Sequence, residues 1–176
     1  GEAYNPALYR AYIASGLDYL YDTAGMYDCL RGVVCQQRAA SEITAQWQAT
    51  DDIRDRMLYF LENHDEQRIA SDFFCGDARK ALPAMMVSAW LRTNPVMVYA
   101  GQEWGERGMD HEGFSGVDGR STIFDYWTVQ AVYQGYFDRS SLGEGQRQLE
   151  AAYQQLLRLA NEEKTLREGA LFDMMY

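Results

Sequence analysis

The stretch PVMVYAG, residues 95–101, constrains the fold of this chain more than any other part of its sequence. It is continuously apolar, contains β-branched residues and ends at a glycine, which is typical of a strand buried on both faces. Two shorter runs, LDYLY at 17–21 and MLYFLE at 57–62, have the same character. Because longer stretches with helical spacing separate these runs, the sequence predicts an alternation of strands and helices.

Helical spacing recurs in four stretches, at residues 5–15, 41–56, 77–92 and 145–163. Ser41 and Asp77 are expected to cap two of these helices, and Pro83 predicts a late start or a kink in the third. The fourth has the clearest apolar stripe, which consists of Leu149, Tyr153, Leu156 and Leu157. Repeating strand–helix units predict a parallel sheet with right-handed crossovers, so the expected fold class is α/β.

Composition excludes two classes of partner. The net charge is −10 and the 16 Lys and Arg residues are scattered, so no basic surface is expected for nucleic acid. The apolar runs are also far shorter than the roughly 20 residues of a membrane-spanning helix. A chain of 176 residues fits one domain or part of a larger one. Its sequence leaves the cellular compartment open.

Polar residues follow the predicted strands at their carboxyl ends. Asn63-His64-Asp65 ends the second run, Gly101-Gln102-Glu103-Trp104 ends the third, and Asp22 follows the first. Glu2 precedes a predicted helix, where an earlier strand would end. Because chemistry in parallel α/β folds gathers at this edge of the sheet, we expect these clusters to share one rim.

Two carboxylates facing each other across a pocket are the core of glycoside hydrolysis. Glu2 and Asp65 are available for this chemistry, His64 could donate to a sugar hydroxyl, and Arg68 could hold a carboxylate ionised. The alternative is that Asn63-His64-Asp65 is only a turn that satisfies its own backbone.

A second histidine, His111, lies between Asp110 and Glu112. Three neighbours in sequence rarely converge on one ion, so a solvated loop is favoured and no metal site is predicted. The surrounding glycine-rich segment lacks a phosphate-binding pattern and is interpreted as a loop over the site.

Four segments together resemble the α-amylase family of retaining glycoside hydrolases, whose catalytic domain is a (β/α)8 barrel. FLENHDEQR is similar to the seventh-strand signature of that family, and PVMVYAGQEWGE to the eighth strand and its loop. GEAYNPALYRAYIASGLDYLYD resembles the end of the fifth strand through the sixth, and YQQLLRLANEEKTLREGALFDMMY resembles the eighth helix. The resemblance implies that residues 1–176 form the C-terminal half of the barrel, with about 167–176 leading into a missing β-domain.

The resemblance also implies roles for individual residues. Glu2 would be the general acid/base, and Asp65 the carboxylate that binds sugar hydroxyls and stabilises the transition state. His64 would donate a hydrogen bond to the sugar, Asn63 would support the turn, and Arg68 falls in the matching segment. The expected substrate of the intact parent is an α-1,4-linked glucan. No cofactor is expected in this chain, although the parent could hold calcium.

The chain departs from the family pattern in one important respect. The nucleophilic aspartate of the family lies in a Gly-x-Arg-x-Asp context on the fourth strand, and this sequence does not contain that motif. We therefore expect little or no activity from the isolated chain. Exposed sheet edges predict a homo-oligomer.

Two alternatives remain open from the sequence. The chain could be a non-catalytic α-glucan-binding module on the same scaffold, or an interaction protein that merely keeps the scaffold. The sequence does not choose between hydrolysis and glycosyl transfer, or between α-1,4 and α-1,6 linkages.

Overall fold

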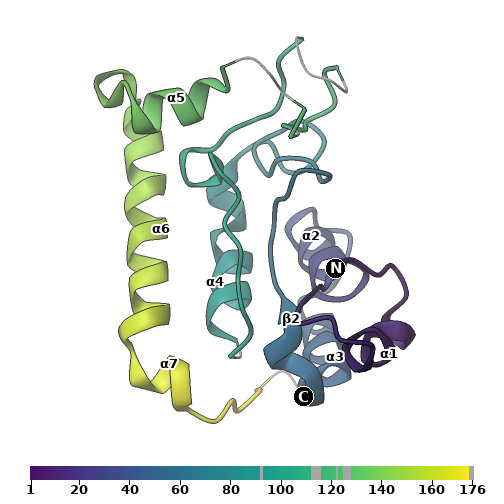
Figure 1. The fold of residues 1–176 in the computed structure, drawn as a ribbon. Coiled ribbons are helices and arrows are strands. Elements are labelled where there is room, and N and C mark those ends of the chain that lie inside the picture. The colour runs from purple at the N-terminus through teal and green to yellow at the C-terminus, as the bar shows by residue number, and fades with distance from the viewer. Residues whose placement is uncertain (92, 112–115, 122, 125–127, 175–176) are drawn as a thin grey trace. The chain divides into compact units, whose positions relative to one another are not determined.

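The computed structural model describes residues 1–91, 93–111, 116–121, 123–124 and 128–174 (Figure 1). The chain divides into two compact units. Unit 1 contains Gly1–Leu61, Ala84–Met97 and Arg158–Tyr176, and unit 2 contains Glu62–Pro83 and Val98–Leu157. The two long helices α4 (Leu82–Trp90) and α6 (Glu144–Glu162) each contribute residues to both units.

Helices make up most of the regular structure in both units. In unit 1 they are η1 (Pro6–Leu8), α1 (Tyr9–Ala14), η2 (Thr23–Tyr27), α2 (Asp28–Val34), α3 (Glu42–Ala49), η3 (Asp51–Arg56) and α7 (Lys164–Glu168). In unit 2 they are η4 (Ala78–Ala81), η5 (Gln102–Trp104), α5 (Gln130–Tyr136) and η6 (Arg139–Ser141). The elements labelled η are short 3-10 helices, except η2, which is a π-helical turn.

The expected helix starts are confirmed in part. The side chain of Asp77 accepts a hydrogen bond from the backbone N–H of Arg79 and so caps η4. The α-helical part of this stretch begins only at Leu82, one residue before Pro83, which matches the late start that the proline predicts. Ser41 precedes α3 but makes no side-chain capping bond.

The predicted fold class is wrong. Within the described residues, the only sheet pairs β1 (Leu20–Tyr21) with β2 (Met57–Leu58) in parallel. Two single-residue bridges, Glu2 with Tyr21 and Tyr59 with Val96, add to this pairing. The protein is mostly helical, and it is not a partial (β/α)8 barrel.

The predicted strands are short because side chains take the backbone groups that a longer ladder would need. The N–H of Tyr99 donates to the side-chain Oε1 of Gln102 at 3.1 Å instead of to a neighbouring strand. Pro95 has no N–H to contribute. The run at 57–62 still pairs at Tyr59, but it is followed by a turn in which the N–H groups of Asp65 and Glu66 bind the side chain of Asn63. The spacing and composition of apolar residues do not show which backbone groups bind side chains instead of a neighbouring strand.

Aromatic residues from separate elements form the core of unit 1. The ring of Phe60 stacks on Tyr27 with centroids 4.8 Å apart and meets the edge of Tyr21 at 5.2 Å. Tyr21 ends β1, Tyr27 ends η2, and Phe60 follows β2 by two residues. This packing fixes the chain just before it enters unit 2 at Glu62.

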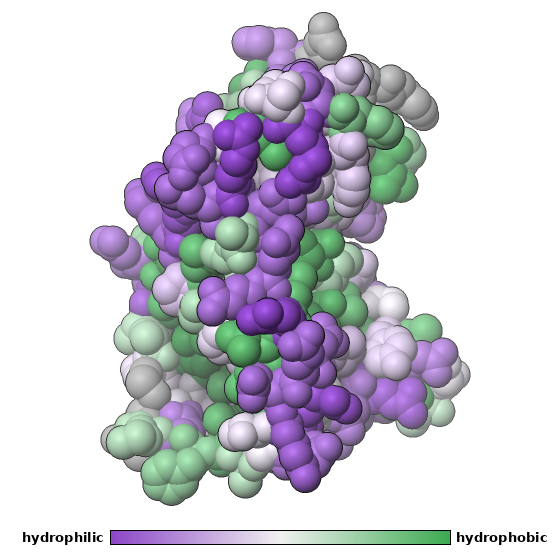
Figure 2. All heavy atoms as spheres, turned by 90° about the vertical axis from the view of Figure 1, so that its left-hand side faces the viewer, coloured by the Kyte–Doolittle hydropathy of each residue, from purple (hydrophilic) through white to green (hydrophobic). Residues whose placement is uncertain are grey.

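The core of unit 2 is built on α6. Its predicted stripe is confirmed at three of four positions, since Leu149, Tyr153 and Leu156 are buried and Leu157 is half-buried. Trp104 forms a separate buried cluster with Ala131 and Leu142. The opposite side of α6 is polar, and Figure 2 shows hydrophilic residues over this helix with hydrophobic ones gathered beside them.

Candidate functional site

The candidate site is the turn that begins at Asn63 in unit 2. The side chain of Asn63 is buried, and its Oδ1 accepts hydrogen bonds from the N–H groups of Asp65 and Glu66, both at 2.8 Å. An asparagine that binds the backbone two and three residues ahead closes a turn locally. The turn therefore directs the next two side chains outward from a fixed base.

His64 and Asp65 are the side chains that this turn presents. The imidazole Nε2 of His64 lies 3.2 Å from a carboxylate oxygen of Asp65. Their side chains are 36% and 55% exposed, so both can reach a ligand while remaining in contact with each other. A carboxylate accepts hydrogen bonds and an imidazole can donate one. Because a hydroxyl group both donates and accepts, this pair can bind two neighbouring hydroxyl groups of a ligand.

Arg68 lies beneath the turn. Its guanidinium Nη1 binds Oε2 of Glu62 at 2.8 Å, and Nη2 donates to the carbonyl of Ala100 at 2.9 Å. The guanidinium also lies over the ring of Tyr99, 4.3 Å from its centre. The Arg68 side chain is only 2% exposed. The structure thus uses Arg68 as an anchor, and its contact with substrate stays a prediction.

Glu62 is the partner that makes this anchor possible. Its side chain is 1% exposed, and its second oxygen accepts the N–H of Ile69 at 2.7 Å. Burial raises the pKa of Glu62, whereas the guanidinium of Arg68 opposes the rise. The expectation that Arg68 faces a carboxylate is therefore met by Glu62, a residue that the sequence analysis did not select. An acidic residue at the end of an apolar run was the available signal, because a buried charge requires a partner.

Glu2 belongs to unit 1, so the structure does not place it with the other predicted residues. It pairs with Tyr21 in a single parallel bridge, and its Oε1 accepts the hydroxyl hydrogen of Thr23 at 3.1 Å. Its side chain is neither fully buried nor fully exposed. The structure brings together Asn63, His64, Asp65 and Arg68, all in unit 2.

Asp22 and Gln102, from the other polar clusters of the predicted rim, are interior residues, whereas Glu103 is half-buried. Asp22 is 1% exposed and accepts the phenolic hydrogen of Tyr9 at 3.1 Å. Gln102 is fully buried, and its Nε2 donates to the hydroxyl of Tyr153 at 2.9 Å. These groups hold the interior together and are not available to a ligand.

No metal centre is found in the part of the chain that the structure describes. No group of three or more His, Cys, Asp or Glu side chains gathers there in a way that could hold an ion. Glu112, one of the two acidic neighbours of His111, lies outside the described residues.

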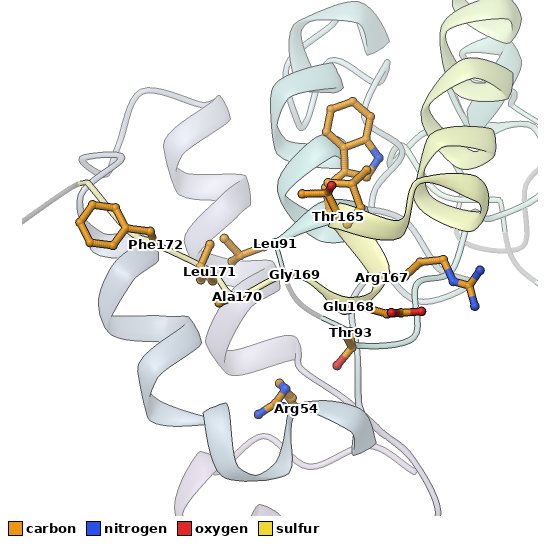
Figure 3. Close-up of a pocket in the computed structure, with 12 residues that line it drawn as sticks. Arg54, Leu91, Thr93, Thr165, Arg167, Glu168, Gly169, Ala170, Leu171 and Phe172 are labelled. Carbon is orange, nitrogen blue, oxygen red and sulfur yellow. The ribbon is translucent and has the colours of Figure 1, made fainter.

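A hollow of about 280 Å³ exists in unit 1, and none of the predicted site residues lines it. Trp90, Leu91 and the segment 165–172 line it, together with Arg54 and Thr93. In Figure 3, Leu91 and Leu171 lie next to each other, whereas Arg167 and Phe172 extend outward on opposite sides. The hollow has no cluster of acid, base or nucleophile and offers no catalytic arrangement.

Comparison with known proteins adds no relative. No family model, no curated protein and no solved structure matches this chain. No helix among the described residues is long and apolar enough to cross a membrane. The relationship to the α-amylase family therefore stays a prediction that rests on the four sequence segments.

Proposed function

We propose that this chain belongs to a retaining glycoside hydrolase of the α-amylase type, and that His64 and Asp65 bind the hydroxyl groups of an α-1,4-linked glucan. One observation carries the proposal. The two side chains predicted to contact sugar are adjacent, partly exposed and presented by a turn that a buried asparagine holds. The resemblance of the sequence segments supplies the substrate class. The barrel fold forms no part of the proposal.

These residues are proposed to bind the transition state of glycosidic bond cleavage more tightly than the bound sugar. Asp65 accepts hydrogen bonds from sugar hydroxyls, and its negative charge stabilises the positive centre that develops as the glycosidic bond breaks. His64 donates to the same sugar. For the intact parent, the resemblance assigns to Glu2 the general acid that protonates the leaving oxygen while the nucleophilic aspartate, whose motif this sequence does not contain, bonds to the anomeric carbon. The Glu2 carboxylate would then act as the base towards the water that releases the sugar from that aspartate.

A second candidate is an α-glucan-binding module without catalysis. It is favoured by the fact that Asn63, His64 and Asp65 form their pair and their support entirely within unit 2. Binding by these residues needs no carboxylate from elsewhere in the chain. Both candidates predict the same sugar contacts, and they differ only in turnover.

Calorimetric titration with maltoheptaose tests the shared prediction. His64→Ala and Asp65→Asn should each weaken binding about tenfold, because each removes one or two hydrogen bonds to the ligand. His111→Ala is the matched control, since it removes the only other histidine and should leave the affinity unchanged. Binding that is absent from the native chain at millimolar sugar, or equal in all variants, contradicts the proposal.

Release of reducing sugar from the same oligosaccharide separates the two candidates. The resemblance assigns no residue of this chain to the nucleophile, so the chain should bind but turn over little or not at all. Turnover that Glu2→Gln abolishes would show that this chain is catalytic on its own.

A further inference from the structure

The segment 116–121 in unit 2 makes direct contact with the turn that presents His64 and Asp65. The guanidinium Nε of Arg120 donates to the backbone carbonyl of Asp65 at 2.6 Å. In the reverse direction, the N–H of Arg68 donates to the carbonyl of Gly119 at 2.6 Å. Two hydrogen bonds therefore hold one segment against the other, although 55 positions separate Arg120 from Asp65.

Arg120 is itself held in place. Its Nη1 lies 2.8 Å from a carboxylate oxygen of Asp118, and its own N–H donates to the other oxygen at 3.1 Å. The carbonyl of the next residue, Ser121, accepts the hydroxyl hydrogen of Tyr99 at 2.8 Å. Since the ring of Tyr99 lies against the guanidinium of Arg68, the segment and the turn share one anchored network.

Two glycines allow the close approach of the chain around Arg120. Gly119 has a φ of 82°, and a Cβ at this position would lie 2.7 Å from Oγ of Ser71. Gly108 has a φ of 59°, and its Cβ would lie 2.8 Å from the backbone of Arg120. Both positions accept only glycine without a shift of the chain, so the close approach depends on the glycines.

We propose that Arg120 is a positioning residue for the ligand-binding pair. A hydrogen bond to the Asp65 carbonyl restricts the backbone between Asp65 and Glu66, and thereby fixes the direction of the Asp65 carboxylate and its contact with His64. A pair fixed before binding loses less entropy when the ligand arrives. The effect on sugar affinity rests on the proposed function, whereas the effect on the turn does not.

Hydrogen exchange of individual amides, followed by NMR, tests the effect on the turn. In Arg120→Gln, the N–H groups of Asp65, Glu66 and Arg68 should exchange roughly tenfold faster, because the loss of a hydrogen bond from a charged donor eases local opening. Arg120→Lys, which keeps the charge and one donor, should recover part of the protection.

Arg107→Gln provides a matched control. Arg107 also bonds one carbonyl and one carboxylate, those of Ala70 and Asp72, and neither bond joins it to the turn at Asn63–Glu66. Its replacement should leave the three amides unchanged. Equal exchange in Arg120→Gln and Arg107→Gln overturns the proposal. If Arg120→Gln does not fold, the same comparison is made between Arg120→Lys and Arg107→Lys.

Titration of the same variants with maltoheptaose tests the consequence for the ligand. Arg120→Gln should weaken binding several-fold and Arg120→Lys should restore part of it. Faster exchange with unchanged affinity overturns the positioning role, provided that His64→Ala does weaken binding. If His64→Ala binds as tightly as the native chain, the proposed function fails, and the exchange rates alone then decide whether Arg120 orders the turn.

Discussion

Unit 1 and unit 2 each contain a carboxylate that is almost completely buried, Asp22 in the first and Glu62 in the second, and the two have different partners. In unit 2, Glu62 faces the guanidinium of Arg68 at 2.8 Å. In unit 1, Asp22 faces the neutral hydroxyl of Tyr9 at 3.1 Å. Both carboxylates are 1% exposed, so the difference between them lies in the partner and not in the depth.

The partner changes how strongly burial favours the protonated form of each acid. A neutral partner leaves the cost of burying a charge largely unmet, and burial raises the pKa of Asp22 to about 6. The guanidinium of Arg68 counters the same cost for Glu62. Burial thus raises the pKa of both acids, but only Glu62 has a cation beside it that opposes the rise, whereas Asp22 favours its protonated form below about pH 6.

Replacement of Arg68 should have the largest effect on stability. Arg68→Met leaves Glu62 buried without its cation, and the loss of one partner of a buried ion pair typically costs about 3 to 5 kcal/mol. Chemical denaturation measures the change in the free energy of unfolding. The double variant Glu62→Gln/Arg68→Met, which removes both charges, should recover a large part of the loss. A single variant that is as stable as the native protein would show that the pair contributes little.

Stability should depend on the protonation of Asp22, with an effect of intermediate size. The pKa of this acid is higher in the folded chain, about 6, than its ordinary value of 3.8. Its contribution is therefore favourable below pH 4 and is lost as the pH rises through 6, by about 3 kcal/mol in total. Asp22→Asn, which mimics the protonated form, should lack this loss.

The measurement is the difference in unfolding free energy between Asp22→Asn and the native chain, followed from pH 4 to pH 7.5. Taking the difference removes the contributions of the other carboxylates. A difference that stays constant over this range contradicts the assignment of a raised pKa to Asp22.

Removal of the Tyr9 hydroxyl should have the smallest effect of the three. Tyr9→Phe deletes one hydrogen bond to Asp22, which is worth about 2 kcal/mol when the carboxylate is ionised and about 1 kcal/mol when it is protonated. The cost should therefore be greater at pH 7.5 than at pH 4. Denaturation of the variant at these two pH values measures it, and an equal cost at both would indicate that Asp22 does not change its charge between them.

The sequence predicted the helices better than the strands. Apolar spacing identified α6 with its buried stripe of Leu149, Tyr153 and Leu156, and capping chemistry identified the start at Asp77. The runs at 57–62 and 95–101 formed only short pairings, in which Met57–Leu58 pairs with β1 and Tyr59 forms a single bridge with Val96. The side chain of Gln102 accepts the hydrogen bond of the Tyr99 N–H, which is then not available to a neighbouring strand. The spacing of apolar residues in the sequence does not indicate this contact.

The same distinction applies to the candidate site. The Asn63 turn could be predicted, because its hydrogen bonds join residues two and three positions apart. The ion pair of Glu62 with Arg68 spans six positions and had a visible signal in a charge that ends an apolar run. The contact between Arg120 and Asp65 could not be predicted, because the folded chain alone brings these positions together.

The buried side chain of Gln102 has a consequence for how this sequence can change over evolution. Its Oε1 accepts the N–H of Tyr99 while its Nε2 donates to the hydroxyl of Tyr153 in α6, so one amide joins an extended segment to a helix 51 positions away. Loss of either group leaves the other with an unmet hydrogen bond in the interior. Positions 102 and 153 should therefore substitute as a pair in related chains, with the tyrosine retained only where the glutamine is present.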